Sequence, residues 1–594
     1  MSDQRLSILR EKMNENQLDY YLVPSSDEHN SEYVPACWQR RSWISHFTGS
    51  AGDVLIGNHQ AYLWTDGRYF LQAEKELDPQ AFKLMKQTGF SPEIESWIGT
   101  QPKGIQLGVD PKVISVKRAH MLRCALNAHQ GELLFIEDNL VDQTRSQVET
   151  LPALPKDPIF CIDENYTGLS AKEKIQQIQE EMASANCQYL ILSALDEIAW
   201  LFNIRGNDVN FNPVAICYAI IALDCATLYI DLDKITQEIT QNLSFQGVVV
   251  KAQSSFEKDL ASLEGRVYLD DATINQWVIN NLNDAITPYY NQSPVVRLKA
   301  VKNAVEQKGM QTAHKKDAVA VISFLQWLEN NWQNGVTELS ASDKLYQFRL
   351  EQSGCVGASF NTISGFGAHG AIIHYAVSDK TDIAIDDSNL YLVDSGGQYY
   401  EGTTDITRVV HLGNPTDEQK TNYTLVLKGH LALGNAVFAN GTCGETLDIL
   451  ARLPLWKNGL DYRHGTGHGV GCFLCVHEGP QKISKVVTKV PLKPGMIVSN
   501  EPGYYQDGDY GIRIENLCLV IDHKTTDYGE FYQFKDLTLV PYNLKLIDKQ
   551  LLSVEEIRQI NTYHQRIRDE IIPLIDNQAI IDWLLEQTEA IANA

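Results

Sequence analysis

Carboxylates that could do chemistry gather in the C-terminal part of the chain, on short apolar segments separated by glycines. The segment 391–394 (YLVD) reads as a strand ending on Asp394, and Asp405 follows after a glycine-rich turn that can bring it back beside Asp394. Residues two apart in a strand share a face, which predicts that Thr403, Asp405 and Thr407 point the same way. Two buried carboxylates held close repel each other unless a cation neutralises them. An Asp at a strand end is commonly a turn residue, so this pair alone does not establish a site.

Three histidines lie close together further along, in and after the segment 463–471 (RHGTGHGVG). His464 and His468 have the spacing of the helical zinc-protease motif, but the glycines between them disfavour a helix and no Glu follows the first His. The glycines favour a close-packed strand or turn instead. His477 follows shortly after.

Two more carboxylates stand in the segments 499–505 (SNEPGYY) and 511–516 (GIRIEN). In the second, alternation predicts a strand with its isoleucines on one face and Arg513 and Glu515 on the other. A charge on an inward face requires a partner. Glu501 supplies the carboxylate of the first segment.

Together these segments supply four carboxylates and one imidazole: Asp394, Asp405, His468, Glu501 and Glu515. Such an oxygen-rich set suits a hard or borderline divalent ion such as manganese, and four negative charges can balance two ions. Two ions a few ångströms apart can share a water and deprotonate it near neutral pH.

Two other motifs are interpreted as incidental. Cys472 and Cys475 form a CxxC, but no second pair and no thioredoxin-like context accompany it, which favours packing. The segment 365–370 (GFGAHG) matches GxGxxG, yet no amphipathic helix follows, so a dinucleotide site is not expected.

The elements that must position these residues follow from periodicity. Residues 299–329 carry apolar side chains at helical spacing, and Thr337 marks the start of another helix. Upstream, the chain repeats itself: strands at 20–23 and 189–192 are each followed by a segment running from Trp to Gly (WISHFTG, WLFNIRG) and by a strand ending in Asp. The predicted fold class is α/β (α+β), with two related N-terminal domains.

Proline-rich or proline-marked stretches at 151–158 and 288–296 suggest the boundaries between domains. They predict two α/β domains at 1–155 and 156–297 and a catalytic domain at 298–594. A length of 594 residues fits several domains.

Charge and composition narrow the classes of partner. A net charge of −25 makes nucleic acid and anionic membrane surfaces poor partners. The longest apolar run, 214–223, is too short to span a bilayer, and the first residues lack a secretory pattern. The 11 cysteines are scattered and odd in number, so reduced thiols and a cytoplasmic location are expected.

The order of these residues, in the settings YLVDSG, GTTDITR, HGTGHGVG, NEPGYY and GIRIEN, resembles the pita-bread metallopeptidase family. Within it, the chain is similar to the long, three-domain, cytosolic form of the X-prolyl aminopeptidases (aminopeptidase P). The segments SSDEHNSEY, FTGSAG, LWTDGRYFLQA, LSALDEIAWLFNIRG and AIIHYA share the likeness, which therefore covers nearly the whole chain.

The resemblance implies a pita-bread fold for the third domain and a role for each metal ligand. Asp394 would bind the first metal, Asp405 and Glu515 would bridge both, and His468 and Glu501 would bind the second. Glu501 would also accept a proton from the nucleophilic water.

The resemblance further implies that His374, His464 and His477 are catalytic residues that bind no metal, with His374, His477 and Arg68 contacting substrate. The implied reaction removes an N-terminal residue when proline is second, through attack by a metal-bridging hydroxide. Two ions per chain, most often Mn²⁺, and a homodimer are implied as well.

Rival functions of the same fold remain open at this stage. Prolidase takes dipeptides, methionine aminopeptidase usually lacks two N-terminal domains, and creatinase works without these metals. A non-catalytic peptide-binding module, as in histone chaperones, is the rival from another class. The five ligands and three histidines argue against it.

Overall fold

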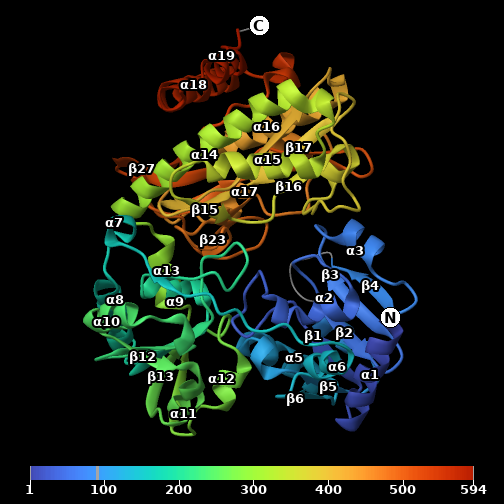
Figure 1. The fold of residues 1–594 in the computed structure, drawn as a ribbon, viewed down its shortest axis with the longest axis vertical. Coiled ribbons are helices and arrows are strands. Elements are labelled where there is room, and N and C mark those ends of the chain that lie inside the picture. The colour runs from blue at the N-terminus through green and yellow to red at the C-terminus, as the bar shows by residue number, and fades with distance from the viewer. Residues whose placement is uncertain (1, 88–92, 593–594) are drawn as a thin grey trace. The chain divides into compact units, whose positions relative to one another are not determined.

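The computed structural model describes residues 2–87 and 93–592 (Figure 1). It separates into two compact units, one made of 1–164 with 169–297 and the other of 165–168 with 298–594. Each unit has hydrophobic cores of its own.

The first unit contains two six-stranded sheets with the same strand order. The first runs β4 (Phe82–Lys86), β3 (Ala61–Thr65), β2 (Asp53–Gly57), β1 (Tyr20–Val23), β5 (Gln106–Val109), β6 (Glu132–Phe135). The second runs β12 (Val248–Ala252), β11 (Ala226–Ile230), β10 (Cys217–Ala222), β8 (Tyr189–Leu192), β13 (Gly265–Leu269), β14 (Ile286–Tyr290). Parallel and antiparallel pairs also recur in the same places. The predicted internal repeat is confirmed.

Helices cover both faces of the first sheet. Tyr21 and Val23 of β1 pack in a core with α1 (Ser2–Glu15) and α6 (Leu140–Val148), whereas Leu22 packs in a second core with α5 (Val116–Ala128). A strand buried on both faces reads as a continuous apolar run, which is how this strand was recognised in the sequence. The second sheet carries α8 (Ala171–Ser184), α9 (Leu195–Leu201), α10 (Gln237–Phe245), α11 (Phe256–Ala261) and α12 (Gln276–Asn280) in its part of the chain.

The second unit packs long helices on a set of small sheets. In Figure 1, α14 (Ala304–Asn331), α15 (Glu338–Leu350) and α16 (Asp417–Gly434) lie over β16 (Ile363–Phe366) and β17 (Leu390–Ser395). One large core joins these helices to α18 (Val554–Ile571) and α19 (Gln578–Gln587). The long predicted helix is confirmed as α14 from Ala304 onward, but its predicted start is wrong, because residues 301–303 are not helical. The second predicted helix is confirmed as α15, whose Thr337 hydroxyl caps it by accepting from Ser340 N.

The strands of this unit form several short ladders. β16, β17 and β20 (Ile406–His411) form one sheet, and β15 (Cys355–Ala358), β18 (Gly397–Tyr399) and β19 (Gly402–Thr403) form another. The largest sheet runs β21 (Val437–Ala439), β28 (Gly529–Asp536), β27 (Asn516–Thr526), β24 (Ile497–Asn500), β22 (Gly467–Gly469), β23 (Glu478–Ile483). β25 (Gly503–Gln506) and β26 (Tyr510–Arg513) form a hairpin, and α17 (Gly444–Trp456) packs on β23.

Two strand predictions are wrong at their ends. Thr403, Asp405 and Thr407 do not share one strand, because β19 ends at Thr403 and β20 begins in a different sheet. The predicted GIRIEN strand also stops, at Arg513, before β27 begins. In both places the chain passes from one sheet to another, and its backbone makes other bonds: Glu515 N donates to the Thr407 carbonyl at 3.2 Å.

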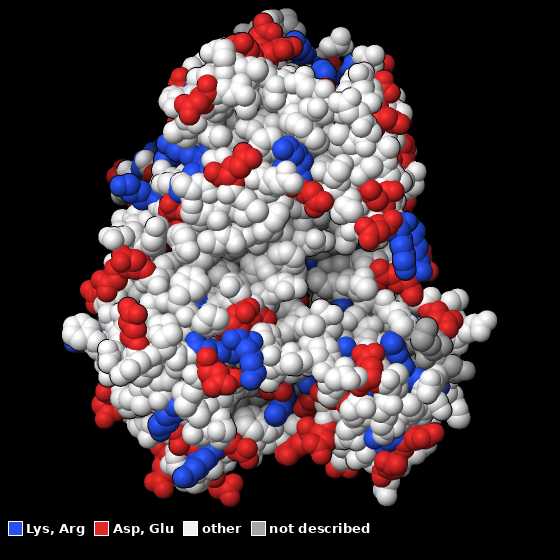
Figure 2. Space-filling view, in the orientation of Figure 1, with Lys and Arg blue, Asp and Glu red and all other residues white. Residues whose placement is uncertain are grey.

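No helix among residues 2–87 and 93–592 combines the length and the apolar character needed to cross a membrane. On the face shown in Figure 2, lysine and arginine side chains are scattered among aspartate and glutamate rather than gathered in one basic patch.

Candidate metal centre

The five predicted ligands come from five separate points of the second unit. Asp394 lies on β17 and His468 on β22, while Glu501 directly follows β24. Asp405 occupies the two-residue break between β19 and β20, and Glu515 occupies the break between β26 and β27. A side chain at a break between strands need not follow the alternating pattern of a pleated sheet. The carboxylates of Asp405 and Glu515 can therefore both point toward the other predicted ligands.

The structure brings these side chains together. Asp405, His468 and Glu515 each offer a ligand atom, and the three atoms lie within 4.8 Å of one another. His468 Nε2 is 3.5 Å from Asp405 Oδ2 and 3.7 Å from Glu501 Oε1. Asp394 and Asp405 are both buried, and their carboxylates interact electrostatically.

The hydrogen bond of the His468 ring to a backbone carbonyl indicates which ring nitrogen carries a proton. Nδ1 lies 3.0 Å from the Gly469 carbonyl oxygen, which can only accept, so we assign the proton to Nδ1. Nε2 then presents a lone pair toward Asp405 and Glu501. When the His468 ring is neutral, three groups that all accept face one another, an arrangement that a shared cation would stabilise.

The carboxylates also perturb one another's protonation. Burial, with the Asp405 charge, raises the pKa of Asp394 from 3.8 to about 6, although Arg513 opposes this. Burial raises the pKa of Asp405 from 3.8 to about 6 as well. The pKa of Glu515 is raised well above its ordinary value by burial and by Asp405, Asp394 and Glu501 in turn. Asp394 Oδ1 is buried and makes no hydrogen bond within the described part of the chain. The donor set fits a divalent cation.

Arg513 holds the carboxylates from one side. Its Nη2 lies 2.5 Å from Asp394 Oδ2, and its Nε donates to the Thr407 hydroxyl at 3.1 Å. That hydroxyl donates in turn to Glu515 Oε2 at 2.7 Å. One guanidinium therefore orients two of the predicted ligands, the second through Thr407.

Tyr505 extends this network to His464. Its hydroxyl accepts from Arg513 Nη1 at 2.6 Å and lies 2.9 Å from His464 Nε2. Arginine only donates, so the single tyrosine proton points to Nε2, while His464 Nδ1 donates to the Gly465 carbonyl at 2.7 Å. Burial, the largest influence, raises the pKa of Tyr505 to about 12, so this proton is retained at neutral pH.

The remaining predicted residues occupy different surroundings. The His477 ring is perpendicular to the His468 ring at 4.3 Å, and its charge lowers the pKa of Asp405. His374 is half-buried and follows the short turn Gly367–Ala371. Arg68 belongs to the first unit, where its guanidinium pairs with Asp66 at 2.8 Å.

Sequence reasoning missed Tyr505, although the motif NEPGYY contains it. No spacing rule links it to His464, because the contact depends on the hairpin of β25 with β26. The two motifs interpreted as incidental have ordinary surroundings: the Cys472 thiol donates to the Glu401 carbonyl at 3.5 Å, and a 3₁₀ turn rather than an α-helix follows β16.

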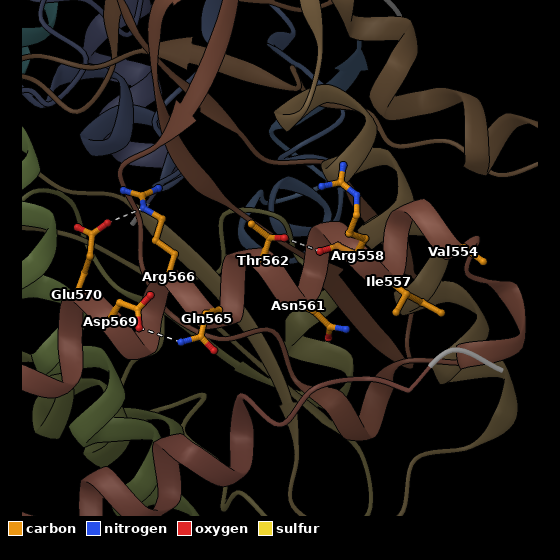
Figure 3. Close-up of a pocket in the computed structure, with 9 residues that line it drawn as sticks. All are labelled: Val554, Ile557, Arg558, Asn561, Thr562, Gln565, Arg566, Asp569 and Glu570. Atoms are coloured by element: carbon orange, nitrogen blue, oxygen red, sulfur yellow. Dashed lines mark hydrogen bonds and ion pairs between the residues drawn. The ribbon is translucent and has the colours of Figure 1, made fainter.

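A hollow on the surface of α18 does not compete with this centre. All the residues that line it come from that one helix, as Figure 3 shows, and neighbouring side chains bond each other there, Arg566 with Glu570 and Gln565 with Asp569. None of the predicted site residues lines it.

The chain matches four family descriptions that together span most of its length. Residues 308–522 match metallopeptidase family M24, and 530–591 match the C-terminal region of that peptidase family. Residues 5–146 and 150–306 both match the creatinase/prolidase N-terminal domain. Two matches to one domain description agree with the repeated sheets.

Individual proteins resemble the chain over its full length. It is 43% identical to "Probable Xaa-Pro aminopeptidase P" of Sordaria macrospora, over 98% of both chains. It is 41% identical to Xaa-Pro aminopeptidase 1 of Dictyostelium discoideum, over 98% of this chain and 95% of the other. The crystal structure of X-prolyl aminopeptidase from Caenorhabditis elegans, described as a cytosolic enzyme with a di-nuclear active site, matches with a TM-score of 0.94, 33% identity and complete coverage of both chains.

The raised carboxylate pKa values predict how the metal-free protein responds to pH. Between pH 3.8 and about pH 6, Asp394 binds more protons in the folded state than in the unfolded chain. The contribution of Asp394 to the free energy of unfolding therefore falls as the pH rises through this window. Relative to Asp394→Asn, chelator-treated wild-type protein should lose about 2 kcal/mol of unfolding free energy between pH 4 and pH 7. Urea unfolding of both proteins measures this difference. A difference that stays constant or grows with pH would contradict the assigned shift.

Proposed function

The chain belongs to metallopeptidase family M24, among the Xaa-Pro aminopeptidases, and we propose that it removes the N-terminal residue from peptides whose second residue is proline, using a dinuclear metal centre. The observation that carries the proposal is the convergence of Asp405, His468 and Glu515, with Glu501 beside them, on one buried place. Such a donor set has no evident purpose without a cation.

The predicted roles of the ligands form the first part of the proposal. Asp394 would bind one ion, His468 and Glu501 the other, and Asp405 and Glu515 both. Manganese is the proposed ion, because carboxylate oxygens predominate and one imidazole completes the set. Two such ions would supply a water of lowered pKa and would polarise the scissile carbonyl.

The surrounding residues would handle protons and the substrate. Glu501 would accept the proton of the attacking water, since burial raises its pKa above the ordinary value and makes it a better base. His374 and His477 would donate to the substrate as negative charge develops on the carbonyl oxygen. His464, whose two nitrogens bond Tyr505 and Gly465, would act with them as predicted from the resemblance.

The finer points of substrate and organisation are also proposals. Arg68 would contact the substrate, and the chain would divide into domains at 1–155, 156–297 and 298–594. A cytoplasmic location is proposed because the C. elegans protein is described as cytosolic.

The deciding experiment compares paired peptides X-Pro-Y and X-Ala-Y with manganese-loaded protein. Release of X should be confined to the proline peptide and should be blocked by N-acetylation. Equal turnover of both peptides would contradict the specificity for proline, and cleavage of X-Pro dipeptides alone would favour a prolidase-type activity. Binding of the peptides without any hydrolysis would favour the peptide-binding module.

Metal stoichiometry tests the dinuclear centre. Purified protein should bind two divalent ions per chain, and a chelator should abolish hydrolysis. Asp405→Ala should lose both ions, because this carboxylate is proposed to bind each of them, whereas Asp569→Ala on α18 should keep both. Elemental analysis after dialysis measures the content. Two tightly bound ions in Asp405→Ala would exclude a bridging role.

The histidines should separate into two kinds. His477→Ala should keep both ions and lose about 10²- to 10³-fold in kcat with a smaller change in KM, because it removes a donor to the developing oxyanion. His468→Ala should lose an ion, and its activity with it. Metal analysis and steady-state kinetics on one X-Pro-Y peptide distinguish them. The proposed division fails if His477→Ala is as metal-poor as His468→Ala or turns over at the wild-type rate.

A homodimer is the remaining proposal, and an exposed stripe on α17 supports it. Ile449, Leu453 and Trp456 are 47%, 41% and 42% exposed, and their spacing places them on one face of the helix. Contiguous apolar side chains on a helix surface commonly mark an interface.

A charge in this stripe should therefore prevent dimerisation. Leu453→Asp should be monomeric at micromolar concentration, while Leu574→Asp, a substitution of another leucine that is 50% exposed, should remain dimeric. Light scattering after size-exclusion chromatography gives the mass. A dimeric Leu453→Asp would mean that the interface lies elsewhere.

A further inference from the structure

The loop that presents His374 is tied to a buried carboxylate outside the metal centre. This loop, residues 366–375, begins at the end of β16, passes through the turn Gly367–Ala371 and ends just after His374. β16 pairs with β17, the strand of Asp394, with Ile363 opposite Asp394. The start of the loop is therefore held by the sheet, and its far end needs another support.

Glu338 contacts the loop at three points. Its Oε1 accepts from the Phe366 backbone N–H at 2.6 Å, where the loop begins. His369 Nδ1, in the middle of the loop, lies 2.9 and 3.0 Å from the two carboxylate oxygens. The Tyr375 hydroxyl, at the far end, donates to Oε2 at 3.0 Å. One side chain thus joins the start, middle and end of the loop.

The carboxylate is stable in this buried place for two reasons. Its side chain is fully buried, yet the three donors solvate it, and each is a hydrogen bond to a charged acceptor. Glu338 is also the first residue of α15, where the helix dipole favours a negative charge. Its backbone carbonyl accepts from the Ser364 hydroxyl at 2.7 Å, which joins the helix to β16 as well.

Tyr375 transmits this anchoring to His374, its neighbour in the chain. Its ring is buried and stacks on His369, with ring centroids 4.4 Å apart and an angle of 23° between the planes. Its single proton has two acceptors in reach, Glu338 Oε2 at 3.0 Å and the Thr381 carbonyl at 3.4 Å, and the shorter contact holds it. With Tyr375 fixed by ring and hydroxyl, the backbone of His374 has little freedom.

The loop also packs tightly against the strand of Arg513. The Gly370 carbonyl oxygen is so near Gly511 on β26 that a Cβ on Gly511 would clash with it. Arg513 on the same strand bonds Asp394. A shift of the loop would therefore displace β26, and with it the Arg513 side chain that bonds the proposed ligand Asp394.

We propose that Glu338 is a positioning residue that fixes His374 for substrate by binding Phe366, His369 and Tyr375 at once. The inference rests on the proposed function, because His374 needs a fixed position only if it meets a substrate. Glu338 is not itself one of the proposed metal ligands or substrate-contacting residues.

A double-mutant cycle tests the inference in the manganese-loaded full chain. Tyr375→Phe removes one hydrogen bond to Glu338 and keeps the ring, so kcat/KM for an X-Pro-Y peptide should fall about 5-fold with both ions retained. In a His374→Ala background the same change should cost less than about 1.5-fold, since the residue through which it acts is gone. Tyr532→Phe, which removes a tyrosine bond to Glu530 on β28, is the matched control and should leave kcat/KM unchanged.

The cycle overturns the proposal if Tyr375→Phe lowers kcat/KM by the same factor in both backgrounds, or if it has no effect in either. Additive losses would show that Tyr375 acts independently of His374.

Hydrogen exchange supplies a second measurement that needs no turnover. In Glu338→Gln, the nitrogen that replaces one oxygen cannot accept from Tyr375 or His369, so amides of 366–376 should exchange at least about 10-fold faster. Amides of β28 should be unchanged. Unchanged exchange in the loop, or equal acceleration throughout the unit, would overturn a positioning role. Failure of the wild-type protein to cleave X-Pro-Y would instead defeat the proposed function alone.

Discussion

Repulsion among four closely placed carboxylates is the constraint on which the second unit depends. Asp394, Asp405 and Glu515 are buried and Glu501 is partly buried. The charge of Asp405 raises the pKa of the other three carboxylates. The folded chain partly offsets this repulsion with hydrogen-bond donors such as Arg513 and Thr407. A bound cation would neutralise the rest. The protein thus carries a local cost in stability at the place where it would do chemistry.

Arg408 shows how the backbone tolerates that cost. Its fully buried guanidinium donates to the carbonyls of Thr407 and Glu515 at 2.9 and 2.6 Å and to Val540 at 2.8 Å. It therefore joins the chain just after one strand break to the chain at the other. Asp405 and Glu515 can leave their strands because this cation satisfies carbonyls that the ladders do not. A lysine has neither the reach nor the planar fork for this set.

Local sequence predicted what depends on local sequence. The apolar runs of β1 and β8, the helical spacing of α14 and the hydroxyl of Thr337 each reveal their element within a few residues. The candidate ligand side chains were also visible locally, since a charged residue beside an apolar run is conspicuous. The repeat was visible because both copies keep their tryptophans and glycines at the same separation.

The rest depends on contacts between distant parts of the chain. The breaks before Asp405 and Glu515 come from changes of sheet, which alternation of side chains cannot reveal. Tyr505 meets His464 across 41 positions, and Glu338 meets Tyr375 across 37. Periodicity carries no information about such pairs, because it describes which face a residue occupies and not what lies opposite.

The two sheets of the first unit have the same strand order and the same strand directions. This likeness affects how the chain can fold. A strand such as β1 has a geometrically equivalent slot in the second sheet, the one that β8 fills, between an antiparallel and a parallel neighbour. During refolding, each strand could enter the wrong slot without violating its backbone pairing, so side-chain shape alone must discriminate. Non-native pairing between adjacent related domains is a known kinetic trap in multidomain chains. Vectorial synthesis, which completes the first sheet before the second emerges, would reduce that competition.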